Sequence, residues 1–184
     1  PGKAHHRPKV AIVIDDFGYS KNNLDVFLAL KQPFTLSILP EQQYSREVAD
    51  RAMAHGFETI LHLPMESDND HDAEEADTIK TGMSETEILL RLKKEINSVP
   101  FIDGVSNHMG SKATADTALM TSIIRYLKSA NLYYFDSLTS NRSVCSEVSG
   151  ALGVGHARRD IFLDNSNNTA AIEKQLEDLK VMAF

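Results

Sequence analysis

Residues 10–20 read VAIVIDDFGYS, an unbroken apolar run that leads directly into the acids Asp15 and Asp16. Such a run without polar alternation is typical of a strand buried on both faces, as in a parallel sheet covered by helices. We therefore expect both acids at the carboxyl end of this strand, where the loops of a parallel α/β fold converge. Two adjacent carboxylates are costly there unless a cation or a proton separates their charges. The alternative is that they begin a turn and cap the helix that follows Gly18.

The rest of the chain alternates between strand and helix patterns, which predicts an α/β fold with a parallel sheet. Strands are expected at residues 34–39, 58–65, 104–108 and 132–137. Helices are expected after Asn22 or Asn23, over 42–55, from Ser84, from Asp116, over 143–152, and over the segment carrying Ile172, Leu176, Leu179 and Met182. Ser84 and Glu87 have the spacing of a capping box.

Length and composition favour one domain over residues 1–184, with 1–8 as a flexible lead-in and 66–82 as an acidic surface loop. A formal charge of −7 gives no electrostatic footprint for nucleic acid. A single cysteine, Cys145, cannot form an internal disulfide, and no apolar run approaches the ~20 residues of a membrane span. The chain begins abruptly with PGKAHHRPK, as an excised soluble domain would, so we expect any export signal to lie outside it.

Polar residues fall at the carboxyl ends of separate predicted strands, namely Asp15, Asp16, His62, His108 and Asp136. Parallel strands of one sheet bring these ends to the same edge. Two imidazoles and a carboxylate match a catalytic zinc site, in which three protein ligands leave a fourth position for water. The alternative for each histidine alone is a structural residue with its hydrogen bonds satisfied inside the fold.

Five separated segments resemble the divergent polysaccharide deacetylases, relatives of the NodB-like carbohydrate esterases. In chain order they are IDDFGYS, LHLPME, GVSNHMGS, FDSLTS and RRDIFLDN, and the similarity runs from about Lys9 to the end. The resemblance implies a distorted (β/α)7-type barrel with outer helices, its last strand missing from this chain. It also implies a divalent metal, most often Zn²⁺, and the removal of N-acetyl groups from a bacterial cell-envelope carbohydrate, in the periplasm or outside the cell, by water that the metal activates.

Carried over by motif, the resemblance makes Asp15 the general base, and Asp16, His62 and His108 the metal ligands. The common deacetylases take both histidines from one His-x-x-x-His segment, whereas the residue four positions after His62 is Glu66. Glu66 is therefore a reserve ligand. The family also draws a catalytic histidine from its last strand, so the general acid is not identified in this sequence.

Further polar residues are candidates for supporting roles. Arg159 and Asp160 are expected to form a pair that orients Asp15, although Arg159 could instead contact sugar hydroxyls or only bridge to Asp160 on a rim. Asn107, Ser111 and Asp136 are candidate substrate-binding residues. Local turn capping is the alternative for Asn107 and Ser111.

The sequence leaves three functions of different classes open. The first is a metal-dependent deacetylase acting on an N-acetylated polysaccharide or a peptidoglycan-type substrate. The second is a metal-dependent phosphoesterase, since Asp and His clusters also serve phosphoryl chemistry; the absence of a P-loop or an arginine cluster argues against it. The third is a non-catalytic envelope protein that keeps the fold to bind glycan or a partner.

Overall fold

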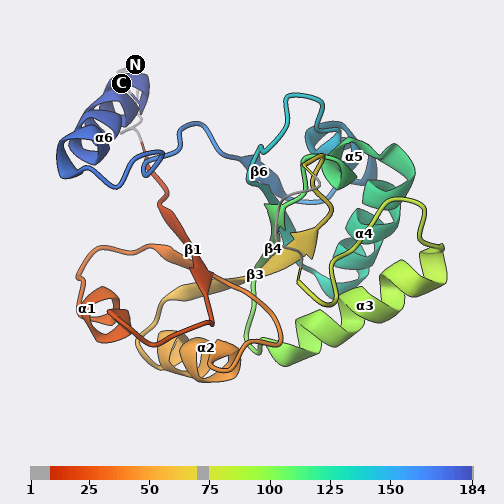
Figure 1. The fold of residues 1–184 in the computed structure, drawn as a ribbon, viewed down its shortest axis with the longest axis horizontal. Helices are drawn as coiled ribbons and strands as arrows, with labels where there is room; N and C mark the ends of the chain where they lie inside the picture. The colour runs from red at the N-terminus through yellow and green to blue at the C-terminus, as the bar shows by residue number, and fades with distance from the viewer. Residues whose placement is uncertain (1–8, 70–74, 184) are drawn as a thin grey trace, which may run out of the picture.

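Six parallel strands alternate with helices in the computed structural model, which describes residues 9–69 and 75–183 (Figure 1). The strands are β1 (Val13–Phe17), β2 (Thr35–Ile38), β3 (Glu58–Met65), β4 (Gly104–Met109), β5 (Tyr133–Asp136) and β6 (His156–Arg158). The helices are α1 (Leu24–Leu28), α2 (Ser45–Ala54), α3 (Glu85–Ser98), α4 (Thr117–Ala130), α5 (Cys145–Leu152) and α6 (Thr169–Ala183), with a short 3-10 turn η1 (Ala113–Ala115) before α4. The predicted α/β class is confirmed.

The strands lie in the sheet in their sequence order, β1 to β6, and every neighbouring pair is parallel. All carboxyl ends therefore point the same way, as the sequence predicts. The resemblance predicts a barrel of about seven strands. The described residues form six strands, and a closed barrel remains an expectation.

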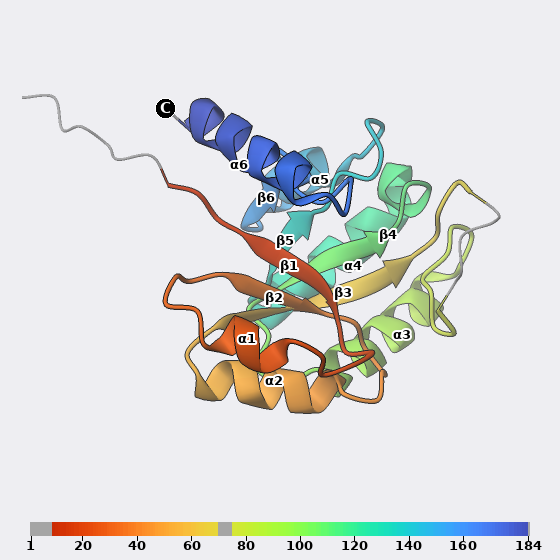
Figure 2. The ribbon, with the colours of Figure 1, turned by 60° about the vertical axis from the view of Figure 1, so that its left-hand side comes forward.

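The sheet is strongly curved around one face. The Ser37 hydroxyl on β2 lies 2.7 Å from the Ser106 hydroxyl on β4, although β3 separates the two strands. In a flat sheet, strands two apart are about 10 Å from each other, so these hydroxyls meet only because the sheet curls. The concave face therefore brings side chains of non-adjacent strands into contact, while helices α2 to α5 pack on the outside (Figure 2).

Local sequence signals explain the helices that cover the outer face. The Ser84 hydroxyl accepts a hydrogen bond from the Glu87 amide, and the Glu87 carboxylate accepts one from the Ser84 amide, so the predicted capping box at α3 is confirmed. The Asp116 carboxylate caps α4 by accepting hydrogen bonds from the amides of Ala118 and Leu119. One face of α4 supplies a large part of the core through Leu119, Met120, Ile123, Ile124 and Leu127.

One strand differs from the sequence-based expectation, and one helix packs differently from the others. The first strand was expected to be buried on both faces, but β1 is an edge strand, and Val13 and Ile14 are only half-buried. Within the described residues β1 has a neighbouring strand on one side only, and it is less buried than the central strands. Helix α6 has no buried residue and stands apart from α1 to α4 in Figure 1.

The described residues bear on two further expectations. None of the described helices combines the length and the apolar character needed to span a membrane. The lead-in over residues 1–8 lies outside the described residues, as do residues 70–74 of the acidic loop.

Candidate metal centre

The two acids of the first strand lie in the carboxyl-terminal half of β1, at the end where the sequence places them. Ile14 pairs with Leu36 and Phe17 pairs with Ile38, so two residues on β1 stand opposite one residue on β2. This is a β-bulge, and Asp16 adopts φ 58°, in the left-handed region that aspartate tolerates better than most residues. In a regular strand, adjacent side chains would point to opposite faces; the bulge lets both carboxylates approach the same histidine.

Asp16 lies between two imidazoles from neighbouring strands. Its Oδ1 atom is 3.4 Å from His62 Nε2 on β3 and 3.1 Å from His108 Nδ1 on β4. The two imidazole rings stand edge to face, with centroids 4.9 Å apart. Asp15 Oδ2 lies 3.8 Å from His62 Nε2, next to these three ligand atoms. The predicted convergence of Asp16, His62 and His108 at one point is confirmed.

The donor set fits a divalent transition metal. One ligand atom from each of Asp16, His62 and His108 lies within 4.8 Å of the other two. A tetrahedral zinc ion with nitrogen and oxygen ligands at ~2.0–2.2 Å places those ligand atoms roughly 3.3–3.6 Å apart. The two contacts of Asp16 are already close to that spacing, and the chemistry of two imidazoles and one carboxylate matches catalytic zinc. These three residues could therefore hold a metal ion.

The electrostatic environments of the two adjacent acids differ. The His108 and His62 imidazoles beside it hold the pKa of Asp16 well below its usual range, so Asp16 is an anion at neutral pH. Burial raises the pKa of Asp15, and the neighbouring charge of Asp16 adds to this increase, whereas His62 opposes it. Asp16 therefore has the character of a ligand, and Asp15 that of a group able to accept a proton.

Access to the cluster is through the carboxylates. The side chains of Asp15 and Asp16 are 45% and 57% exposed, whereas that of His62 is 4% exposed and that of His108 is 15% exposed. The imidazoles thus form the floor of the site and the acids its open side. A small cation and part of a larger substrate can reach the same point from solvent.

Two buried serines support His62, and the sequence analysis missed both. Ser106 Oγ lies 2.9 Å from His62 Nδ1, the ring nitrogen that faces away from Asp16, and 2.7 Å from Ser37 Oγ. Strand alternation could have identified Ser106. Ser106 lies two residues before His108 on the same strand, so the two side chains point to the same face of the sheet. It is also the direct partner of His62 in the strand register.

Asn107 and Asp136 lie on the opposite, helix-covered face of the sheet. The Asn107 amide group donates to the Met109 carbonyl and accepts from the Ser137 amide and the Tyr134 hydroxyl. Asp136 is buried, and its two oxygens accept from the Leu138 amide and the Ser143 hydroxyl. The strand alternation that points His108 toward the metal cluster points Asn107 away from it. These contacts indicate structural roles and do not support the predicted substrate contacts.

Arg159 contacts the backbone after β5. Its guanidinium donates to the carbonyls of Ser137 and Leu138, at 2.7 and 2.9 Å. Within the described ranges no ion pair joins Arg159 to Asp160, which is exposed. Asp164 lies in the same segment, and its negative charge contributes to the raised pKa of Asp15. The expected Arg159–Asp160 pair is therefore not formed in this structure.

Glu66 and Ser111 form hydrogen bonds between the loops that follow β3 and β4. Glu66 accepts from the amide and hydroxyl of Thr81, at 2.7 and 2.6 Å, and from the Lys112 ammonium at 2.7 Å. These bonds and Lys112 hold the pKa of Glu66 below its usual value against the effect of burial. Ser111 Oγ accepts from the Asp68 amide and lies 3.2 Å from Ser67 Oγ. The reserve ligand is thus engaged with loop residues, and the described metal cluster does not include it.

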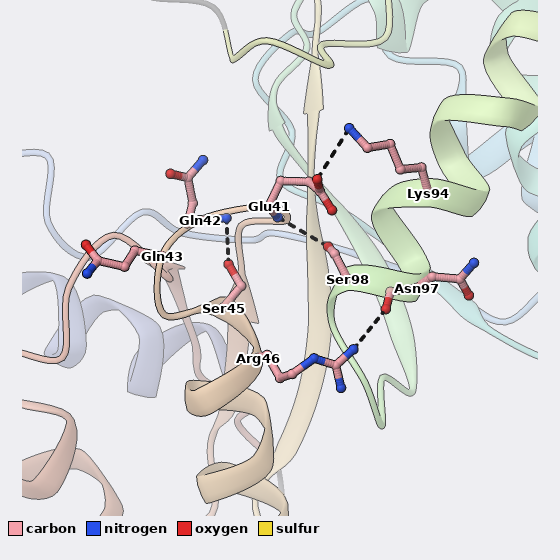
Figure 3. Close-up of a pocket in the computed structure, with 8 residues that line it drawn as sticks. All are labelled: Glu41, Gln42, Gln43, Ser45, Arg46, Lys94, Asn97 and Ser98. Carbon is pink, nitrogen blue, oxygen red and sulfur yellow. Dashed lines mark hydrogen bonds and ion pairs between the residues drawn. The ribbon is translucent and has the colours of Figure 1, made fainter.

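A polar pocket of about 420 Å³ lies apart from the metal cluster, between the β2–α2 connection and the end of α3 (Figure 3). Its lining residues are Glu41, Gln42, Gln43, Ser45, Arg46, Lys94, Asn97 and Ser98. Many of its polar groups pair with one another, as in the contact of Lys94 with Glu41 and that of Arg46 with the Asn97 carbonyl. The reactive groups described above take no part in it, so the candidate site is the open cluster.

A parallel α/β sheet with Asp16, His62 and His108 at one point defines a candidate metal-binding protein. The family model for divergent polysaccharide deacetylases matches residues 12–183. The chain therefore belongs to the divergent polysaccharide deacetylase family. The resemblance seen in the sequence segments is confirmed over nearly the whole chain.

Two curated relatives share this similarity. The chain is 36% identical over 167 residues to uncharacterized protein YibQ of Escherichia coli K12, covering 91% of this chain and 52% of that protein. It is 34% identical over 169 residues to an uncharacterized protein of Haemophilus influenzae, covering 92% of this chain and 60% of that protein. The chain thus spans little more than half the length of these relatives.

A solved structure supports the fold. The crystal structure of an uncharacterized protein from Agrobacterium tumefaciens C58 superposes with a TM-score of 0.91 and 22% sequence identity. The match covers 100% of this chain and 75% of the other. The same arrangement of strands and helices therefore occurs in an experimentally determined protein.

Proposed function

We propose that this domain is a metal-dependent deacetylase that removes N-acetyl groups from a cell-envelope carbohydrate. The observation that carries the proposal is the meeting of Asp16, His62 and His108 at one solvent-accessible point, with Asp15 beside them. Membership of the divergent polysaccharide deacetylase family supports the substrate class. The same relationship supports a periplasmic or extracellular location as part of this proposal.

The chain's own residues divide the work at the site. Asp16, His62 and His108 would hold a divalent cation, and the nitrogen-rich donor set favours Zn²⁺. Such a cation, when bound, supplies a Lewis acid that polarises a carbonyl and lowers the pKa of water. Asp15 stays off the three-residue cluster and would accept the proton of the attacking water at its carboxylate. Its raised pKa suits that role, because a base works best when its pKa approaches the working pH.

Two side chains beside the cluster are suited to contact a sugar. Tyr19 follows the acids of β1, and Met109 follows His108; they are 50% and 38% exposed. The Tyr19 hydroxyl donates to the Glu75 carboxylate, which fixes the ring at the edge of the acidic loop. Tyrosine combines a large apolar ring with a polar hydroxyl, so an exposed ring near the metal cluster offers a surface on which a substrate can pack. We therefore infer that Tyr19 and Met109 contact the substrate.

Acetate release from N-acetylated glycans tests the proposal. Wild-type protein loaded with Zn²⁺ is expected to release acetate from N-acetylated oligosaccharides or peptidoglycan fragments, to stop when a chelator is added, and to recover when Zn²⁺ is restored. A His62→Ala variant prepared in parallel should not recover. Stoichiometric metal with unchanged glycan would contradict the proposal and favour a binding protein. Hydrolysis of generic phosphate esters instead would favour a phosphoesterase.

A further inference from the structure

A chain of three buried polar groups runs from the metal cluster into the interior of the sheet. His62, Ser106 and Ser37 are 3%, 1% and 0% exposed. His62 Nδ1 lies 2.9 Å from Ser106 Oγ, and Ser106 Oγ lies 2.7 Å from Ser37 Oγ. Ser106 Oγ also has the Leu61 carbonyl within 3.4 Å. These three polar groups contact one another directly, and their order is fixed by the strands β2, β3 and β4 that carry them.

The partners of Ser106 determine which nitrogen of His62 carries a proton. A neutral imidazole has one N–H and one lone pair, and a hydroxyl has only one proton to donate. Ser106 has two further acceptors, the Ser37 hydroxyl and the Leu61 carbonyl, for its own proton. It is therefore free to accept a hydrogen bond from Nδ1 of His62.

The other side of the imidazole offers a weaker hydrogen bond. His62 Nε2 lies 3.4 Å from Asp16 and 3.8 Å from Asp15, both longer than the usual 2.7–3.2 Å of an N–H···O bond. The contact of Nδ1 with Ser106, at 2.9 Å, is within that range. The better hydrogen bond thus favours the proton on Nδ1, which leaves the lone pair of Nε2 directed at the cation site.

We propose that Ser106, oriented by Ser37, is a positioning residue that holds His62 in the tautomer able to bind a cation through Nε2. The inference rests on the proposed metal role of His62 and names how the fold prepares that ligand. A metal ligand histidine commonly donates its second N–H to a fixed partner, and loss of that partner typically weakens metal binding by ~10- to 100-fold.

Nitrogen NMR of the imidazole tests the tautomer directly. In metal-free protein, at a pH about two units above the usual histidine pKa of ~6.5, wild-type His62 is expected to show one tautomer, protonated at Nδ1. Ser106→Ala should give a mixture of both tautomers and a ~10- to 100-fold weaker affinity for Zn²⁺. Ser37→Ala should shift both readouts in the same direction by less, because it removes only the orienting group.

Ser149→Ala is the matched control, since Ser149 is a buried serine whose hydroxyl has no hydrogen-bond partner among the described residues. It should leave both the tautomer and the affinity unchanged. Wild-type populations and wild-type zinc affinity in Ser106→Ala would overturn the inference. Neither readout uses acetate release, so a failure of the proposed activity is distinguishable from a failure of this inference.

Discussion

An Asp15→Asn variant is expected to release acetate roughly 10²- to 10⁴-fold more slowly than wild type while keeping its full complement of bound metal. The asparagine has nearly the same shape but cannot accept a proton. Asp15 lies 3.8 Å from His62 Nε2 and outside the three-residue ligand cluster, so its loss should not release the cation. Steady-state rates of acetate release, together with the metal content of the same sample, measure both quantities.

The control for this variant is Asp50→Asn, which alters an exposed acid on α2. Its rate should equal that of wild type. An Asp15→Asn protein that loses its metal would identify Asp15 as a ligand. One that keeps both metal and rate would exclude it as the base.

Among the proposed substitutions, replacement of Glu95 is expected to change the free energy of unfolding most, by removing a loss of stability that develops as pH rises. Glu95 lies on the buried side of α3, on the same stripe as Ile88 and Leu92, and is 0% exposed. Neither of its carboxylate oxygens accepts a hydrogen bond from the described residues. Burial raises its pKa to about 8, and Asp77 adds to the increase, against a lowering effect of Arg91. Ionisation of this group is therefore costly in the folded state.

The sign of the pH dependence follows from that shift. Below the ordinary glutamate pKa of about 4.5 the side chain is neutral in both folded and unfolded chains, and burial carries no charge penalty. As pH rises toward 8, the unfolded chain ionises freely while the folded chain resists, so the free energy of unfolding falls. The cumulative loss is on the order of a few kcal/mol by pH 8.

Urea unfolding across that pH range measures the effect. Glu95→Gln is expected to remove most of the decline between pH ~5 and ~8, and Glu95→Leu to remove it and raise stability throughout by filling the apolar stripe. Glu177→Gln on α6, an exposed acid, is the control and should leave the wild-type profile intact. Parallel profiles for Glu95→Leu and wild type would show that Glu95 is not the group responsible.

Most of the fold could be predicted because its signals are local. Strand β3 matches the predicted residues 58–65, and the capping box of α3 is formed by the two residues whose spacing predicted it. The bulge in β1 could not be predicted, because it depends on how Asp15 and Asp16 align with β2 across the sheet. No pattern within residues 10–20 carries that information.

The ligand cluster could be predicted because parallel strands bring their carboxyl ends together, and His62, His108 and Asp16 obey that rule. The rule does not specify which face of the sheet each side chain takes, so it also includes Asp136, which lies on the helix-covered face. The twofold alternation of a strand would have separated Asn107 from His108. A helical period would likewise have placed Glu95 on the buried side of α3.

The proposed activity requires one cation held by Asp16, His62 and His108. Elemental analysis of protein purified without chelator measures that cation. We expect about one zinc, or another divalent metal, per wild-type chain. Asp16→Ala and His108→Ala should lose that metal while remaining folded, and His156→Ala, which removes an exposed histidine on β6, should keep it. Metal retained in both Asp16→Ala and His108→Ala, or absent from folded wild type after exposure to Zn²⁺, would contradict the account.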